Sequence, residues 1–181
     1  MEAHRKGGFA VIVVDASILT GVFFEERAAE GAFDEIREIE EMGASRSGGL
    51  VAPDFVLLEL ANTVISNRRK LGRRSDPSAS ASSVNRLNDM PTSLLAGEIR
   101  RRLAIVDLVL EPALTERRYA RALHLAELHR LSMYDACYVA LAEELRATLA
   151  TLDRAMQDAA RQLGIPVLPS QGLGGSSLRV N

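Results

Sequence analysis

Short apolar runs alternate along this chain with longer segments in which apolar residues recur every three to four positions. The short runs lack the polar alternation of a strand with one solvated face, so they predict strands buried on both faces of a parallel sheet. These strands are expected at 9–14, 49–52, 106–110, 148–152 and 165–168. The longer segments predict helices at 17–24, 27–42, 54–71, 113–129, 133–146 and 154–163, with a less regular stretch at 78–104. The alternation predicts an α/β fold with a short parallel sheet of about five strands flanked by helices.

Two segments are rich in small and polar residues and interrupt this pattern. Residues 75–83 predict a loop or a frayed helix start, and the Gly/Ser-rich residues 170–181 predict a flexible tail. A chain of 181 residues is long enough for one domain with a real core. We therefore expect a single domain over residues 1–169.

Two of the apolar runs end directly on an aspartate, at Asp15 and at Asp153. Ligand sites of parallel sheets lie outside the carboxyl ends of the strands, so this placement suggests a site, most naturally for a metal. Each aspartate could instead cap the helix that follows it. Capping is the stronger interpretation for Asp153, whereas Ser17 offers a second capping side chain near Asp15.

The helix expected at 54–71 is apolar around most of its circumference. Its remaining wedge holds Glu59, Asn62, Thr63 and Ser66 and contains no Lys or Arg, which a solvated face usually carries. A polar cleft wall is one interpretation, and a short solvated face is the other.

Asp135 is the only residue charged at neutral pH between Leu131 and Ala142. The helix that it opens is apolar nearly all round. Ser132 stands three residues before it, which approximates a capping box, so a capping role and a functional role both remain open.

Four segments together resemble the PIN domain, and within it the VapC-like toxins of toxin–antitoxin pairs. They are Val13–Leu19, Glu59–Asn62, Tyr134–Ala142 and Thr151–Arg154. The resemblance spans residues 10 to about 168 and implies a three-layer α/β fold. It also implies a metal-dependent endoribonuclease whose acidic residues bind Mg²⁺ or Mn²⁺ and cleave RNA. Those catalytic and metal-binding residues are Asp15, Glu59, Asp135 and Asp153.

The resemblance further assigns supporting roles to Ser17, Asn62 and Thr151. It implies a homodimer and a small antitoxin protein that blocks the cleft. The long 75–104 stretch and the Gly/Ser tail depart from the compact toxin pattern, which affects the expected dimer contacts and the details of substrate access and not the acidic site.

Electrostatics supports a cation at such a cluster independently of the resemblance. Two carboxylates about 4 Å apart repel by roughly 4 kcal/mol at an effective dielectric constant near 20. Oxygen-only ligands favour a hard ion such as Mg²⁺ or Mn²⁺ over zinc. The three histidines, His4, His124 and His129, show no zinc-like spacing with Cys137.

Composition narrows the partners and the compartment. With 22 Lys and Arg against 24 Asp and Glu the net charge is −2, so contacts to nucleic acid would need local basic patches. The candidate runs are 68–70, 73–74, 100–102 and 117–121, although such runs are often solvated helix faces and none is assigned as a site. Aromatic residues make up 4% with no Trp, which favours a short or structured RNA over a long stacked strand.

The single cysteine, Cys137, excludes an internal disulfide and fits a buried residue in a reducing compartment, so we expect a cytoplasmic protein without membrane contact.

Other classes with acids at strand ends fit less well. A receiver domain would need an early acidic pair and a late lysine, but no lysine follows Lys70. A haloacid-dehalogenase-type phosphatase would need an acid where Ser17 stands. The remaining alternative is a catalytically inactive PIN-fold protein that binds RNA or a protein partner.

Overall fold

The computed structural model describes residues 11–23, 34–38, 49–71 and 90–170. The predicted loop at 75–83, most of the helix predicted at 27–42 and the tail beyond residue 170 lie outside these ranges. Within the described ranges, no helix is both long enough and apolar enough to cross a membrane.

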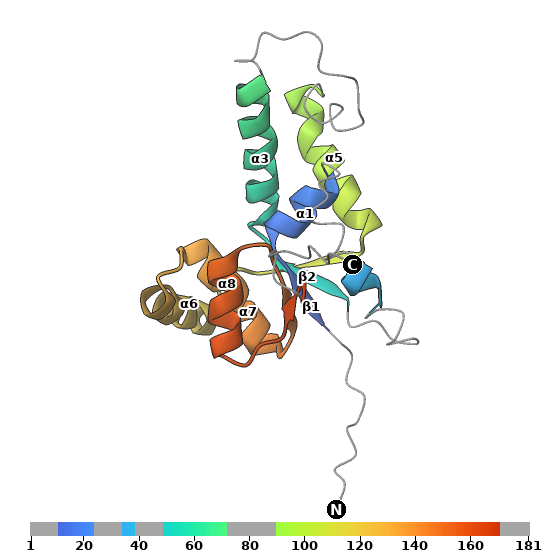
Figure 1. Ribbon diagram of the computed structural model, residues 1–181. Helices are drawn as coiled ribbons and strands as arrows, with labels where there is room; N and C mark the ends of the chain where they lie inside the picture. Colours follow the sequence, from blue (N-terminus) through green and yellow to red (C-terminus); the bar gives the residue numbers. More distant parts are fainter. Residues whose placement is uncertain (1–10, 24–33, 39–48, 72–89, 171–181) are drawn as a thin grey trace, which may run out of the picture.

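The described elements confirm the predicted alternation of strands and helices (Figure 1). The strands are β1 (Ile12–Val14), β2 (Leu50–Pro53), β3 (Leu108–Glu111), β4 (Thr148–Ala150) and β5 (Val167–Leu168). The helices are α1 (Ala16–Phe23), α3 (Val56–Leu71), α5 (Thr92–Ile105), α6 (Glu116–His129), α7 (Met133–Leu145) and α8 (Arg154–Gln162), and residues 34–38 are also helical.

The strands form one five-stranded parallel sheet in the order β3-β2-β1-β4-β5. At its centre, Val13 of β1 pairs with Val51 of β2 and with Leu149 of β4. Because the strands are parallel, the residues that follow β1, β2 and β4 meet at one edge of the sheet. This register brings the chain after Val14 next to the chain after Ala150.

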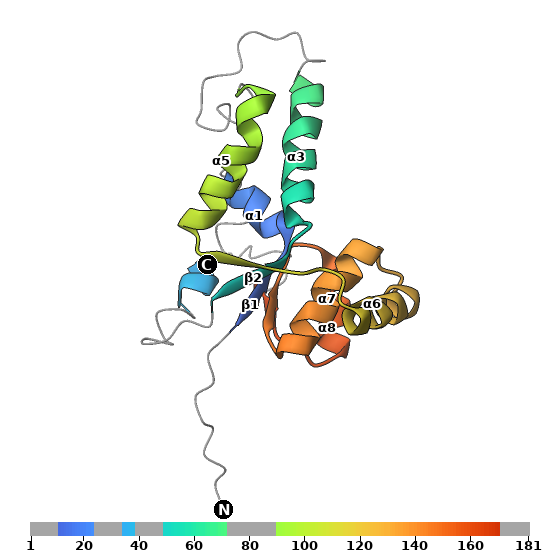
Figure 2. The same cartoon turned by 180° about the vertical axis from the view of Figure 1, so that it is seen from behind.

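Helices cover the sheet in two groups. α7 contacts β1, β2 and β4, and α6 and α8 pack against α7. α3 lies beside both α1 and α5, and the α3–α5 pair extends away from the sheet in both views (Figures 1 and 2). The α/β prediction with a five-stranded parallel sheet flanked by helices is therefore confirmed.

Burial follows the prediction in the centre of the sheet and departs from it at one edge. Every residue of β1 and β2 is buried. β3 is only partly buried, and Val109 is 50% exposed. The prediction of burial on both faces is wrong for β3 because this strand lies at the sheet edge, beyond the strands β1, β2 and β4 on which α7 packs.

α7 is buried from Ala136 to Ala142, as expected for a helix that is apolar nearly all round. It fills the layer between the sheet and the outer helices. Cys137 lies in this stretch, 3% exposed and unpaired, and burial raises the pKa of its thiol. The cysteine is therefore the buried residue that the sequence predicted.

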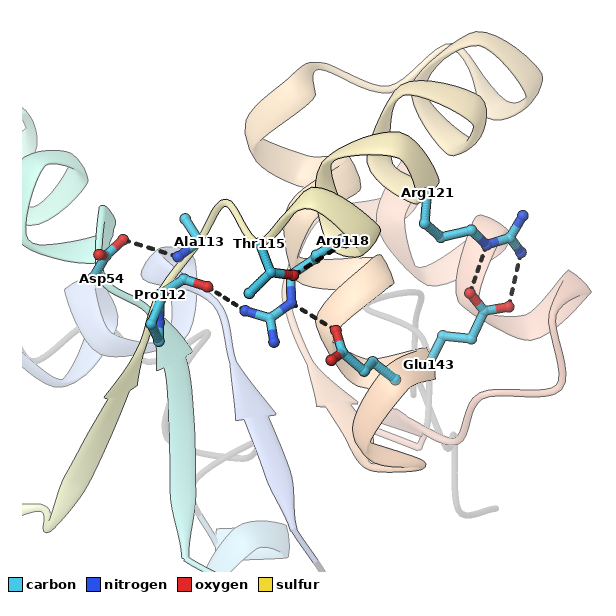
Figure 3. Close-up of polar contacts among 8 residues, drawn as sticks. Asp54, Pro112, Ala113, Thr115, Arg118, Arg121 and Glu143 are labelled. Atoms are coloured by element: carbon cyan, nitrogen blue, oxygen red, sulfur yellow. Dashed lines mark hydrogen bonds and ion pairs between the residues drawn. The ribbon is translucent and has the colours of Figure 1, made fainter.

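Two helices begin later than predicted. Asp54 and Phe55 form a turn before α3, and the Asp54 carboxylate accepts a hydrogen bond from Ala113 N (3.2 Å) beyond the end of β3 (Figure 3). α6 begins after Thr115, whose hydroxyl oxygen accepts a hydrogen bond from Arg118 N (3.2 Å). Asp54 thus binds the chain beyond β3, and Thr115 is the N-cap of α6, so neither residue lies within the helix that follows it.

Candidate functional site

Asp15 lies immediately after the central strand β1 and is 6% exposed. Its backbone N–H donates to Ala150 O (2.9 Å), which fixes the residue against β4. Its Oδ2 accepts hydrogen bonds from Ser17 Oγ (2.5 Å) and Thr151 Oγ1 (2.8 Å). Burial raises the pKa of Asp15, and these hydrogen bonds oppose the rise. The structure thus brings Asp15, Ser17 and Thr151 together as the sequence predicted.

Glu59 lies in the first turn of α3 and is half-buried. Its Oε2 accepts a hydrogen bond from the Tyr138 hydroxyl of α7 (2.6 Å). Burial, together with the negative charges of Asp15 and Asp135, raises the pKa of Glu59 from 4.5 to about 7, and the Tyr138 hydrogen bond opposes the rise. Glu59, Asp15 and Asp135 are therefore close enough to interact electrostatically.

Asp135 lies in the first turn of α7, and Ser132 is the N-cap of that helix. The Ser132 hydroxyl accepts a hydrogen bond from Asp135 N (3.1 Å) and donates one to Asp135 Oδ2 (2.7 Å). Ser132 therefore caps the helix as predicted, while the carboxylate of Asp135 binds the serine hydroxyl and not its backbone amide. The negative charge of that carboxylate contributes to the raised pKa of Glu59.

Asp153 is the N-cap of α8, and its Oδ1 accepts a hydrogen bond from Met156 N (2.9 Å). The capping interpretation is confirmed for this residue. Asp153 N donates to Thr151 Oγ1 (3.0 Å), the same hydroxyl that binds Asp15. Among the described residues, the charges that raise the pKa of Glu59 are those of Asp15 and Asp135. The backbone of Asp153 is thus linked to Asp15 through Thr151, and no hydrogen bond within the described ranges links Asp153 to Glu59 or Asp135.

Asn62 does not join this arrangement. Its side chain is exposed, and none of the hydrogen bonds found within the described ranges involves it. Thr63 donates to the backbone of its own helix, at Glu59 O (3.0 Å), and Ser66 is exposed. Beyond Glu59, the polar wedge of α3 is therefore largely the solvated face that the alternative interpretation described.

Sequence reasoning missed Tyr138 and Gln157 as parts of the site. Tyr138 is fully buried, and a buried tyrosine hydroxyl usually needs a hydrogen-bond partner. It lies three residues after Asp135, on the same helix face, which is the signal that could have revealed it. Gln157 is 2% exposed and donates from Nε2 to Thr151 O (2.8 Å), which supports the segment that carries Asp153.

A model of the PIN-domain family matches residues 12–162. The chain belongs to the PIN-domain family. PIN domains are typically metal-dependent nucleases. A search of the curated proteins found no match. Among solved structures, the crystal structure of PAE2754 from Pyrobaculum aerophilum is similar, with a TM-score of 0.52 and 19% identity over 89% of this chain and 92% of that chain. That likeness supports the PIN fold.

Several arginines in the described part of this PIN domain make hydrogen bonds or ion pairs within the structure. Arg68 donates to Met90 O (2.6 Å), which joins α3 to the segment before α5. Arg118 is buried and pairs with Glu144 (2.8 Å), and it also donates to Pro112 O.

Two further pairs follow the same pattern. Arg121 forms a two-bond pair with Glu143 (2.6 and 2.8 Å; Figure 3). Arg101 makes a similar pair with Glu98 (2.7 Å for both bonds). These contacts favour structural roles for much of the basic runs.

The donor set of the acidic site fits a hard divalent cation. Within the described part of the chain, no three Asp, Glu, His or Cys side chains converge closely enough to hold a metal ion as they stand. Asp15, Glu59 and Asp135 are nevertheless electrostatically linked, and no positive charge is among the causes that set the pKa of Asp15 or Glu59. Oxygen ligands with uncompensated negative charge are what Mg²⁺ or Mn²⁺ prefers.

Proposed function

We propose that this PIN-domain protein is a metal-dependent endoribonuclease that hydrolyses RNA phosphodiester bonds. The proposed ligands of Mg²⁺ or Mn²⁺ and catalytic residues are Asp15, Glu59, Asp135 and Asp153. One observation carries the proposal: burial and two neighbouring carboxylates hold the pKa of Glu59 at about 7, with no positive charge among the causes. A fold gains nothing from such a cluster unless a cation or protons neutralise it.

Each of the first three acids has a hydroxyl that fixes its position. Ser17 and Thr151 hold Asp15, Tyr138 holds Glu59, and Ser132 holds Asp135. A divalent ion bound there would make its bound water more acidic and would bind a phosphate oxygen of the RNA as a Lewis acid. One carboxylate of the site would orient the attacking water or accept its proton.

The test is cleavage of a mixed pool of cellular RNAs by the purified protein with Mg²⁺ or Mn²⁺. EDTA and an Asp15→Asn variant serve as negative controls. Glu127→Gln is a matched control, since Glu127 is an exposed acid of α6 outside the site. The proposal expects discrete, metal-dependent cuts by the wild type and the control, and none by Asp15→Asn. Mapping the RNA ends would then identify the target.

The alternative is a PIN-fold protein that binds RNA or a protein partner without cleaving. The lack of three converging ligand side chains in the described ranges favours it. Equal inactivity of wild type and Asp15→Asn, with binding retained in both, would establish this alternative and remove the catalytic role of the acids.

The resemblance to VapC-like toxins supports three further parts of the proposal. The protein would act in the cytoplasm as the toxin of a toxin–antitoxin pair, it would form a homodimer, and a small antitoxin would block its cleft. Light scattering of the purified protein measures the oligomeric state. Growth arrest on expression, relieved by coexpression of a neighbouring small gene, tests the toxin role.

A further inference from the structure

Tyr134 is a large aromatic residue whose side chain is exposed to solvent. It directly precedes Asp135 in the first turn of α7 and is 57% exposed. Among the described residues, the exposed aromatic side chains are Tyr134 and Tyr119, and Tyr119 lies on α6. Tyr134 is therefore the exposed ring that adjoins a candidate catalytic acid.

Packing holds this ring in place despite its exposure. Phe55 makes an edge-to-face contact with Tyr134, with ring centres 5.2 Å apart and ring planes at 78°. Phe55 makes a second such contact with Tyr138, at 5.4 Å and 88°. Tyr138 in turn donates its hydroxyl to Glu59 (2.6 Å). A chain of contacts therefore links the exposed ring to a candidate metal ligand.

The geometry leaves a face of the Tyr134 ring open. In an edge-to-face pair, one ring points its edge at one face of the other ring. Tyr134 either supplies the edge, which leaves both of its faces free of Phe55, or supplies the face, which leaves its opposite face free. In both cases at least one face of Tyr134 is not covered by Phe55, which agrees with its exposure of 57%. An ordered ring with a free face is a suitable surface for stacking a flat aromatic group.

We propose that Tyr134 is a stacking position for a single nucleobase of the RNA, next to the bond that is cut. This inference rests on the proposed ribonuclease function and assigns a substrate-positioning residue to it. A base stacked on Tyr134 would set which phosphate enters the acidic site. A single stacking ring also agrees with the low aromatic content, 4% with no Trp, which argues against a platform for a long strand.

A binding experiment tests the proposal without relying on catalysis. Proteins carrying Asp15→Asn are titrated with a labelled, mixed-sequence RNA decamer and with an abasic decamer that has the same ribose-phosphate backbone. Stacking on one aromatic residue predicts that Tyr134→Leu weakens binding of the RNA by roughly 5- to 150-fold. The abasic decamer should bind equally to both proteins. Tyr134→Phe should restore binding, and Tyr119→Leu, the matched exposed tyrosine, should leave it unchanged.

Cleavage by the otherwise wild-type enzyme gives a second readout. Tyr134→Leu should raise KM more than it lowers kcat and should broaden the set of cut sites, whereas Tyr134→Phe should keep both. The chain has three tyrosines and no Trp, so quenching of tyrosine emission by RNA that is present in the wild type and lost in Tyr134→Phe reports on the stacked ring. A residue that only packs against Phe55 would not give this quenching.

The outcomes separate the two proposals. If the wild type does not cleave RNA, the ribonuclease function fails, while the binding experiment still decides the role of Tyr134. If the wild type cleaves, but Tyr134→Leu is folded, cuts the same sites and binds both decamers like its parent, the stacking role is overturned and the function stands. Equal loss with the base-containing and abasic decamers would also overturn it, because that loss would reflect the backbone or a covering protein surface.

Discussion

Among the described residues, the hydroxyl of Tyr138 is the one contact that stabilises the charged form of Glu59, so its removal is a direct test of the site's electrostatics. Tyr138→Phe deletes the 2.6 Å hydrogen bond and keeps the ring that packs against Phe55. Burial and the charges of Asp15 and Asp135 would then act on Glu59 without opposition. We expect the pKa of Glu59 to rise.

The size of the rise follows from the energy of the lost bond. A hydrogen bond to a charged group contributes roughly 1.5–3 kcal/mol, and the lower figure suits Glu59 because it is half-buried. One pKa unit corresponds to about 1.36 kcal/mol, so the pKa should move by about one unit, from about 7 towards about 8. At pH 7 the charged fraction of Glu59 would fall from about one half to about one tenth, which weakens apparent Mg²⁺ binding by about fivefold.

Carbon-13 NMR titration of the Glu59 carboxyl group in metal-free protein measures the pKa directly. Mg²⁺ titrations followed by the melting temperature, at pH 7 and pH 9, measure the consequence. The deficit of Tyr138→Phe should be clear at pH 7 and nearly absent at pH 9, where Glu59 is charged in both proteins. Tyr119→Phe removes an exposed hydroxyl on α6 and should change neither quantity. An unchanged or lowered pKa of Glu59 in Tyr138→Phe would refute the reasoning.

Three further predictions concern stability. Folding raises the pKa of Glu59 from 4.5 to about 7, so protonation of Glu59 favours the folded state. The free energy of unfolding of the metal-free protein should therefore fall by about 1–2 kcal/mol, after allowance for solvent screening, as pH rises from about 5 to about 7.5. Glu59→Gln should flatten this urea-midpoint profile, and Mg²⁺ should restore the stability of the wild type at pH 7.5; a profile that rises with pH would contradict the shift. Glu144→Leu should cost about 3 kcal/mol in urea unfolding, since it leaves the guanidinium of Arg118, which is 4% exposed, without its carboxylate partner. Arg118→Met should cost less, because the Glu144 that it leaves is 32% exposed and can be hydrated; equal costs would argue against burial as the cause. Ser132→Ala should cost about 1 kcal/mol through the lost α7 cap and should also lower RNA cleavage, and a stability loss with full activity would remove its role in positioning Asp135.

The order of strands and helices was predictable because apolar periodicity reports directly on burial. The prediction of burial on both faces failed at β3, where an apolar run of the same kind forms an edge strand with Val109 half exposed. Sequence cannot tell an edge strand from a central one, since that depends on which strands become neighbours. The late start of α3 has a similar cause, because the partner of Asp54 is Ala113 N, 59 residues away. The late start of α6 is local, because Thr115 caps that helix through Arg118 N.

Parts of the site could be predicted for the same reason. Asp15 and Thr151 follow paired parallel strands, so their proximity is a consequence of sheet register. The contact between Tyr138 and Glu59 joins residues 79 positions apart through the packing of α3 against α7, which no local pattern encodes. Asn62 shows the reverse error: its helical position was read correctly, but that face of α3 is exposed.

The acids also differ in how much of their presence a structural role explains. Asp153 caps α8, and this alone would account for it. Asp135 is helped by Ser132, which performs the capping itself, so the carboxylate is not needed for the helix. Glu59 caps nothing among the described contacts, is half-buried, and lies in the field of two like charges. An uncharged residue at position 59 would avoid the cost of burying a negative charge beside two others. Glu59 is therefore the acid that a structural role explains least and that the proposed metal and reaction explain best.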